Sequence, residues 1–277
     1  MKIRKPVWAN QFYPGDPHEL DATLTEYFDQ AALQQTGKRI VGLIAPHAGY
    51  PYSGPTAAVA YKQLENKHYH TVVVCSPSHA TPIEGVSVYD GDLYETPLGR
   101  IPVDTELTVK LEQKSDVIQR SSAGHEGGFR PEHALEVQLP FLQKILREFK
   151  LVPLVFNDFK WEVCQELGHA MAEVLDSEKT LIVASSDLYH GQSYEEAMRT
   201  DKETLAAIES FDAEKFCDKS EKHEIMACGA GPITALMVAT KKWNTQAPRV
   251  LGHTTSADVL GKSGGYVVGY AAAIIEK

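Results

Sequence analysis

The stretch LIAPHAGYPYSG, residues 43–54, decides the fold class, because an apolar run ends there in a loop and a helix-compatible segment follows. The run RIVGLIA over 39–45 has the length and the continuous apolar character of a strand that is buried on both faces. Ser53 and Pro55 suit the start of a helix over 53–66. The loop between strand and helix carries one histidine, His47. A strand, a turn and a helix in this order favour a parallel α/β sheet.

Segments with the same two patterns alternate through the rest of the chain. Continuous apolar strands that alternate with helices are typical of a parallel sheet covered on both faces. The sequence therefore predicts a single α/β domain over residues 1–277, with a mostly parallel sheet and helices on both faces. The predicted strands are 39–45, 70–76, 86–90, 151–156, 180–186, 249–255 and 265–274, a hairpin over 86–103 adds an edge, and the predicted helices are 17–34, 53–66, 104–114, 133–149, 160–176, 193–209 and 229–243.

The charge balance and the apolar runs exclude several classes of protein. With 27 Lys and Arg against 37 Asp and Glu, the net charge of −10 disfavours binding to nucleic acid or to an anionic membrane surface. The longest apolar run, YVVGYAAAII, is far shorter than the roughly 20 residues that span a bilayer. No apolar segment follows the basic residues at the start, so we predict no signal peptide and a cytoplasmic location. The 4 cysteines have no CxxC spacing, which favours free thiols.

Histidines stand where three of the predicted strands end. His47 lies in APHAGY, His79 in SPSHATP, and His190 in SSDLYH together with Asp187. A single histidine at a strand end is more often an ordinary surface residue. Loops at the carboxyl ends of parallel strands converge, however, and histidine is both a common metal ligand and a common acid or base. Three such positions together predict a shared pocket.

Two further segments hold candidate residues. Cys228, in MACGAGPITAL, precedes an apolar helix, where the helix dipole favours a thiolate ligand or nucleophile; a buried core thiol is the alternative interpretation. His133 and Glu136, in EHALEVQLPFLQ, are three residues apart on one helix face. They suit metal ligands or groups that orient ligands, and a helix start with a favourable acid explains them equally well.

The sequence lacks the short motifs that mark nucleotide-binding enzymes and metalloproteases. No GxGxxG follows the first strand, and the sequence contains no GxxxxGK[ST] phosphate loop. A metalloprotease HExxH motif is also absent. A nucleotide-dependent enzyme is therefore disfavoured.

Eight ordered motifs resemble one known family over essentially the whole chain. They are ANQFYPGDP, APHAGYPYSGP, SPSHATP, YETPLGRIPVD, EHALEVQLPFLQ, SSDLYH, ACGAGPI and GYVVGYAA. In order and spacing they are similar to the Memo family, whose eukaryotic member mediates cell motility driven by an ErbB-type receptor. Prokaryotic members are often labelled AmmeMemoRadiSam system protein B, which implies a functional link to AMMECR-type and radical-SAM proteins.

The resemblance implies a fold and a set of site residues. Memo proteins share the fold of class III extradiol (LigB-like) dioxygenases, which are non-haem iron enzymes. By this resemblance His47 and His79 fall on the metal-binding histidines. Cys228 falls where the dioxygenases have a carboxylate ligand and Memo has a cysteine, and His190 falls on the acid/base histidine, with Asp187 beside it. Two imidazoles and a thiolate form a softer site than the dioxygenase set, and they would accept Fe(II), Cu or Zn.

Two functions follow as hypotheses. The first is a metal-dependent oxidoreductase that acts on a small substrate. His47, His79 and Cys228 hold Fe(II) or Cu, and His190 moves a proton with its tautomer set by Asp187 or a backbone carbonyl.

The second hypothesis is a binding or adaptor protein that uses the old catalytic pocket. Tyr50, Tyr52 and Tyr189 would then form aromatic walls for a peptide or another ligand, and the histidines would supply hydrogen bonds. A metal-free hydrolytic enzyme and an accessory protein for a radical-SAM partner are further alternatives.

Overall fold

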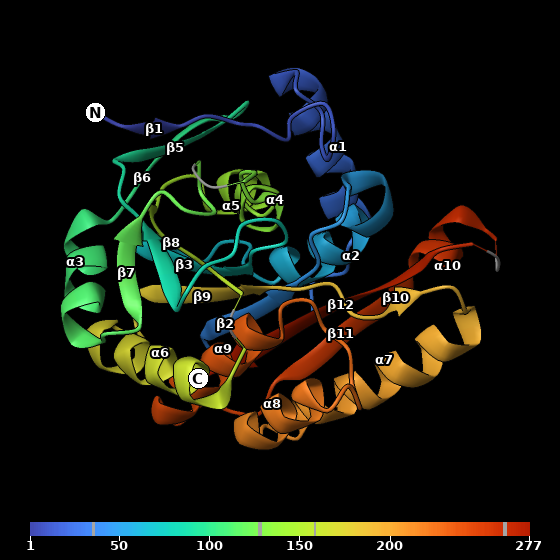
Figure 1. The fold of residues 1–277 in the computed structure, drawn as a ribbon. Coiled ribbons are helices and arrows are strands. Elements are labelled where there is room, and N and C mark those ends of the chain that lie inside the picture. The colour runs from blue at the N-terminus through green and yellow to red at the C-terminus, as the bar shows by residue number, and fades with distance from the viewer. Residues whose placement is uncertain (35–36, 127–128, 158, 263–264) are drawn as a thin grey trace.

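A mixed sheet of nine strands carries helices on both faces within the described part of the chain, residues 1–34, 37–126, 129–157, 159–262 and 265–277 of a computed structural model (Figure 1). Its strands are β2 (Ile40–Ala45), β3 (Thr71–Pro77), β4 (Val86–Tyr89), β7 (Ile118–Ser121), β8 (Lys150–Phe156), β9 (Thr180–Ser185), β10 (His190–Gly191), β11 (Arg249–Thr255) and β12 (Val267–Glu276). The helices are α1 (Pro17–Gln30), α2 (Tyr50–Lys62), α3 (Thr105–Lys114), α4 (His133–Glu136), α5 (Leu139–Leu146), α6 (Trp161–Val174), α7 (Tyr194–Glu209), α8 (Ala213–Glu221), α9 (Ala230–Lys242) and α10 (Ser256–Leu260).

The strand order is β10-β12-β2-β9-β3-β8-β4-β7, and β11 also pairs with β12. The four central strands, β2, β9, β3 and β8, are parallel to one another. Antiparallel pairs flank them, between β12 and β2 on one side and between β4 and β8 on the other. The predicted parallel arrangement therefore describes the centre of the sheet, and the outer strands make the sheet mixed.

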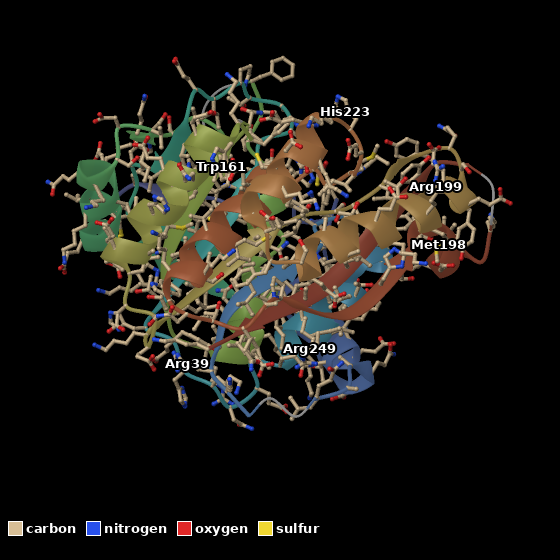
Figure 2. The ribbon with its side chains drawn as sticks, turned by 90° about the horizontal axis from the view of Figure 1, so that it is seen from below. Arg39, Trp161, Met198, Arg199, His223 and Arg249 are labelled. Carbon is tan, nitrogen blue, oxygen red and sulfur yellow. The ribbon has the colours of Figure 1, made fainter. Side chains whose placement is uncertain are left out.

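Each face of the sheet is covered by its own layer of helices. In β3, Val72 and Val74 pack into the cluster that contains α1, α2 and α5, whereas Val73 and Cys75 pack against α6 and α9 on the opposite face. Strands buried on both faces are apolar at every position, which explains the continuous runs in the sequence. Figure 2 looks onto the second layer, with Trp161 on α6.

A second, smaller sheet corrects the prediction for the hairpin over 86–103. Strands β5 (Leu93–Thr96) and β6 (Gly99–Pro102) do form an antiparallel hairpin. This hairpin pairs with β1 (Ile3–Arg4) in a separate three-stranded sheet, whereas β4 joins the main sheet. The N-terminal strand has only two residues, so its pairing leaves no periodic pattern in the sequence.

The helices of the structure differ from the predicted helices at several points. Helix α2 begins at Tyr50 after Gly49, and Ser53 lies inside it, where its hydroxyl donates to Ala48 O. The predicted helix over 133–149 is divided into α4 and α5, and Pro140 lies in the first turn of α5. Helices α8 and α10 were not predicted. Among the described residues, no helix is both long enough and apolar enough to cross a membrane.

Candidate metal centre

Three predicted ligands meet at the carboxyl edge of the central strands. His47 follows β2, His79 follows β3, and Cys228 precedes α9. One donor atom from each of these residues lies within 4.8 Å of the other two. The imidazole rings of His47 and His79 are 5.1 Å apart between centroids. Residues far apart in the sequence thus form a compact group that could hold a metal ion.

The hydrogen bonds around His47 determine which of its nitrogens is free. Ser185 Oγ donates its single proton to Ala134 O at 2.7 Å and accepts from Gln138 Nε2 at 2.7 Å. The contact of 2.9 Å between His47 Nδ1 and Ser185 Oγ therefore requires a proton on Nδ1. The Nε2 lone pair is left facing Cys228 Sγ at 3.1 Å. His47 is thus held in the tautomer that could bind a metal ion through Nε2.

One carboxylate holds two more imidazoles. Glu132 Oε1 accepts from Nδ1 of His79 at 2.9 Å and from Nδ1 of His133 at 3.0 Å. It also caps α4 by accepting from the backbone N–H of His133 and Ala134. Burial raises the pKa of Glu132, but the hydrogen bonds from His133 and His79 outweigh it and hold the pKa well below its usual range.

His79, Glu132 and His133 also form a second group with metal-ligand types. Because the carboxylate oxygens already accept five N–H groups, we assign Glu132 to orientation of the imidazoles. The His133 ring lies 4.6 Å from His79 and 4.5 Å from Phe12, so it is fixed between two rings.

Cys228 is placed by a close approach of backbones. A Cβ on the next residue, Gly229, would lie 2.3 Å from Ser185 O, so only glycine allows this contact. The backbone N–H of Asp187 donates to Cys228 Sγ at 3.2 Å. Burial raises the pKa of the Cys228 thiol, and the charge of Asp187 raises it further. The metal-free group is therefore a thiol that donates to His47 Nε2, and a bound metal would replace that proton.

Burial has opposite effects on the two titratable groups beside the thiol. The pKa of His47 is well below its usual value, because burial and the charges of His79 and His133 disfavour the imidazolium. Burial raises the pKa of Asp187 to about 7, against the hydrogen bonds from the backbone N–H groups of His47 and Ala48. A neutral imidazole is the form that binds metal.

Asp187 and His190 are neighbours in sequence but have different partners. Asp187 Oδ1 accepts from the backbone N–H of His47 at 2.7 Å, so this carboxyl group positions the loop that carries His47. The His190 Nδ1 donates to Leu188 O at 2.9 Å, which leaves Nε2 as the free nitrogen. Burial lowers the pKa of His190. Of the two predicted ways to set the His190 tautomer, the structure has the backbone carbonyl.

Three other predicted site residues point away from the centre. Glu136 forms a buried ion pair with Arg4 and accepts from the Tyr13 hydroxyl, so it fastens the N-terminal segment instead of sharing a site with His133. Tyr50 is buried, and its hydroxyl donates to Val137 O at 2.9 Å. Tyr189 is also buried, and its hydroxyl donates to Glu196 Oε2. Both tyrosines are packing residues, not walls of an open pocket, whereas Tyr52 is exposed.

The sequence did not reveal Glu132 or Ser185, although both hydrogen-bond to candidate ligands, Glu132 to His79 and Ser185 to His47. Glu132 could have been found from its position directly before a helix, where an acidic side chain caps the first backbone N–H groups. Ser185 ends β9, between β2 and β3 in the sheet, so its side chain lies between the two histidine loops.

A small cavity reaches the centre. Its volume is about 120 Å³. It is lined by Pro77, Ser78, His79, Phe156, Asn157, Phe159, Cys228, Gly231 and Pro232. Two of the three candidate ligands therefore face a space that admits a ligand of few atoms, and two phenylalanines border that space.

The fold and the site define an α/β protein that carries a candidate His-His-Cys metal centre on the loops at the carboxyl edge of its sheet. Residues 4–274 match the family described as Memo-like protein. A MEMO1 family protein of Nitrosopumilus maritimus is 37% identical over 275 residues, covering 98% of both chains. A MEMO1 family protein of Methanosarcina mazei is 35% identical and covers 100% of both chains. The chain belongs to the Memo family.

A solved structure supports the fold independently. An uncharacterized protein from Escherichia coli K12 superposes with a TM-score of 0.54 at 15% identity, covering 84% of this chain and 99% of that chain. At this identity the likeness concerns the fold alone.

Proposed function

We propose that this protein is a metal-dependent oxidoreductase that acts on a small substrate. The observation that carries the proposal is the group of His47, His79 and Cys228, whose donor atoms lie within 4.8 Å of one another. Two imidazoles and a thiolate suit Fe(II), Cu or Zn, and the first two of these metals exchange electrons. The resemblance to non-haem dioxygenases favours Fe(II), and the thiolate favours Cu.

The residues around the group support metal binding more than they support a structural role. His47 and His79 each have Nδ1 committed to a hydrogen-bond acceptor. Ligand histidines in proteins usually have their second nitrogen fixed in this way. The bound metal would supply redox chemistry and orient a small ligand beside it.

The other residues have roles that follow from their contacts. Glu132 orients His79 and His133, and Asp187 positions the loop of His47. The partly buried His190 offers Nε2 as a proton acceptor near neutral pH, since burial lowers its pKa. Phe156 and Phe159 give the cavity beside His79 and Cys228 an apolar side.

The alternative of a binding protein without catalysis lacks its aromatic pocket. Tyr50 and Tyr189 are buried with satisfied hydroxyls, so neither can stack on a ligand without unfolding its surroundings. The residues that line the cavity include no arginine, so the cavity lacks the side chain that most often binds the phosphate of a phosphopeptide.

Oxygen uptake by the reconstituted protein tests the proposal. The protein would be loaded anaerobically with Fe(II) or Cu(I), and oxygen consumption would be followed with catechol or ascorbate as the reductant. His190→Gln should retain the metal and lose about 100-fold or more of the rate. His18→Gln, which changes an exposed histidine on α1, is the matched control and should match the wild type. Equal rates in wild type and His190→Gln would remove His190 from proton transfer, and wild type without metal or uptake would contradict the proposal.

A further inference from the structure

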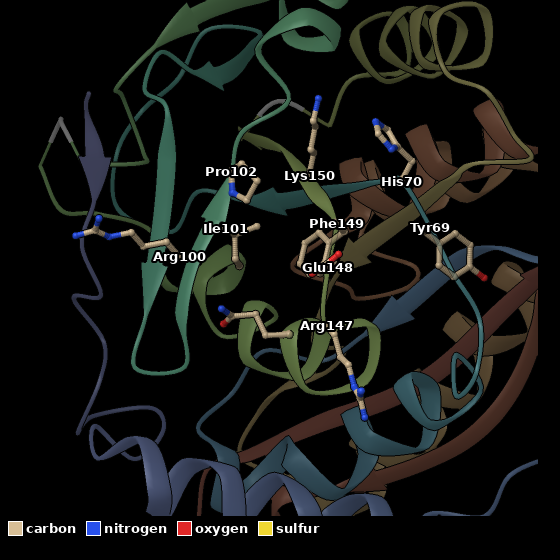
Figure 3. A pocket seen from close by; sticks show the side chains of 10 residues that line it. Tyr69, His70, Arg100, Ile101, Pro102, Arg147, Glu148, Phe149 and Lys150 are labelled. Atoms are coloured by element: carbon tan, nitrogen blue, oxygen red, sulfur yellow. The ribbon is translucent and has the colours of Figure 1, made fainter.

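A hollow at the opposite edge of the sheet from the candidate metal centre has charged residues that do not converge. Its volume is about 450 Å³, and it lies beside Tyr69 and His70, which precede β3. Figure 3 shows the side chains of Arg147 and Lys150 extending in opposite directions, so these two charges do not meet on one ligand. A polar group that is better placed for a function lies on α7, behind His190.

This group is Asp201, a carboxylate that joins two other elements. Its side chain is fully buried on α7, which packs against β11 and β12 (Figure 1). Asp201 Oδ1 accepts from the backbone N–H of Tyr189 at 2.9 Å, and Oδ2 accepts from Nε2 of His253 on β11 at 2.8 Å. The His253 side chain is 18% exposed. The pair therefore connects the protein surface to the segment directly before His190.

The backbone of β12 leaves room for this carboxylate. A Cβ on Gly269 would overlap Asp201 Oδ2, so only glycine allows the carboxylate to lie here. The same glycine holds the segment before His190. Its N–H donates to Tyr189 O at 2.9 Å, and its carbonyl oxygen accepts from Leu188 N at 2.8 Å. Together with the bond from Asp201, these contacts fix both backbone polar groups of Tyr189.

The position of the His190 ring depends on this fixed segment. His190 Nδ1 donates to Leu188 O, and the backbone N–H of His190 donates to Met226 Sδ at 3.1 Å. Both bonds keep their geometry only while the backbone of Tyr189 stays in place. The free Nε2 of His190 thus takes its direction from the bonds that hold Tyr189.

Several neighbours act on the charge of the His190 ring. Burial lowers its pKa, and the hydrogen bond to Leu188 O raises it. The charge of His79 lowers the pKa further, whereas the charge of Asp201 raises it. The Tyr266 ring also faces His190, at 6.3 Å between centroids. Asp201 is therefore the acidic group that favours the imidazolium form of His190.

We propose that Asp201 and His253 are positioning residues for the proton transfer assigned to His190. Asp201 holds the segment before the ring, and its negative charge stabilises the imidazolium that forms when Nε2 takes a proton from the substrate. His253 keeps Asp201 in place through Oδ2. The inference rests on the proposed oxidoreductase, in which His190 accepts that proton, and its first two tests need no turnover.

NMR titration of the His190 ring in the metal-free protein tests the charge of Asp201. Asp201→Asn keeps an oxygen for the Tyr189 N–H and removes the charge, so the midpoint of the His190 titration should move to lower pH by about 0.5 or more. Glu203→Gln removes an exposed carboxylate from the same helix and should move the midpoint by about 0.1 at most. An unchanged midpoint in Asp201→Asn, or an equal shift in Glu203→Gln, would overturn the proposal.

Hydrogen exchange at the Tyr189 amide tests His253 and does not depend on the folding of Asp201→Asn. His253→Phe removes the donor to Asp201 Oδ2 from a partly exposed position and should speed this exchange about fivefold. His253→Gln places an amide N–H where Nε2 was and should match the wild type. Equal exchange in all three proteins would remove His253 from the positioning pair.

Oxygen uptake by the metal-loaded protein separates this inference from the proposed function. Asp201→Asn should keep the metal content and the KM of the wild type and should lose about tenfold of kcat. A wild-type kcat in this variant would overturn the inference and leave the oxidoreductase in place. Absence of uptake in the wild type would contradict the proposed function, while the titration and the exchange still decide whether Asp201 and His253 position His190.

Discussion

The buried His125 and the more exposed His79 and His190 differ in the number of ring nitrogens that have hydrogen-bond partners. His125 has both nitrogens satisfied, with the Tyr94 hydroxyl at Nδ1 at 2.5 Å and Ser87 O at Nε2 at 3.1 Å. His79 and His190 have Nδ1 bonded, and no group of the described ranges bonds their Nε2. Because Glu132 and Leu188 O each take up Nδ1, Nε2 is the nitrogen of His79 and of His190 that could bind a metal ion or a proton. The hydrogen bonds thus distinguish a histidine with two satisfied nitrogens from the candidate site histidines, which keep one nitrogen available.

The largest effect is expected from the thiol. Cys228→Ser should lower metal affinity by about 100-fold or more, because a hydroxyl is a far poorer ligand for soft metals than a thiolate. Cobalt(II) substitution gives a direct readout, since a thiolate ligand produces a charge-transfer absorption band. Cys217→Ser, in which the hydroxyl can still donate to Phe159 O, serves as the control and should keep the band. A band that survives in Cys228→Ser would remove the thiolate from the site.

Glu132→Gln tests whether orientation of the imidazoles matters. The neutral amide accepts more weakly from His79 and His133, so metal affinity should fall about 10- to 100-fold. Competition with a chelator measures this change. Glu26→Gln, on the exposed side of α1, should leave affinity unchanged. If Glu132→Gln binds metal as tightly as the wild type, the carboxylate has no role in the centre.

His125 should make the free energy of unfolding depend on pH. Burial lowers the pKa of His125 to about 3 from an ordinary 6.5, so the folded protein keeps the neutral ring where the unfolded chain binds a proton. Stability from this group is complete above pH 6.5 and is lost as the pH falls toward 3. The loss should be about 2 kcal/mol between pH 7 and pH 5.

Urea unfolding at several pH values measures this loss, with His125→Gln as the comparison. The variant should be less stable at pH 7 and should lose less stability on acidification. Parallel curves for the two proteins would show that His125 is not the responsible group.

The smallest effect concerns Tyr50, which the sequence placed in the pocket. Tyr50→Phe removes the hydrogen bond to Val137 O and should cost about 1 kcal/mol of unfolding free energy. Metal content should stay at the wild-type level, as should that of Tyr52→Phe. A loss of metal in Tyr50→Phe but not in Tyr52→Phe would show that the Tyr50 hydroxyl supports the metal centre.

Much of the centre was predictable because strand ends are visible in the sequence. His47 and His79 follow apolar runs, and parallel strands bring their carboxyl ends to one edge. Glu132 was missed because helical spacing drew attention to Glu136, three residues beyond His133. Helix α4 has only four residues, and its cap carboxylate turns back to the imidazoles while Glu136 turns to Arg4.

The rest depends on contacts that leave no local pattern. The pairing of β1 with the β5–β6 hairpin joins segments about 90 residues apart. Strand β1 has only two residues, which is too short for a periodic pattern that would predict this pairing. The role of Ser185 likewise depends on Ala134 and Gln138, which reach it from another layer. Periodicity predicts elements, whereas hydrogen-bond partners across layers require the fold.

The metal content of untagged protein, purified anaerobically and measured by mass spectrometry, tests the central claim most directly. Wild type would be measured beside His79→Ala, Cys228→Ala and the exposed-residue control His18→Ala. We predict nearly one iron or copper per wild-type or control chain and almost none in the other two variants. A wild type that holds no metal even after reconstitution with Fe(II) and Cu(I), or variants that hold as much as the wild type, would contradict the account.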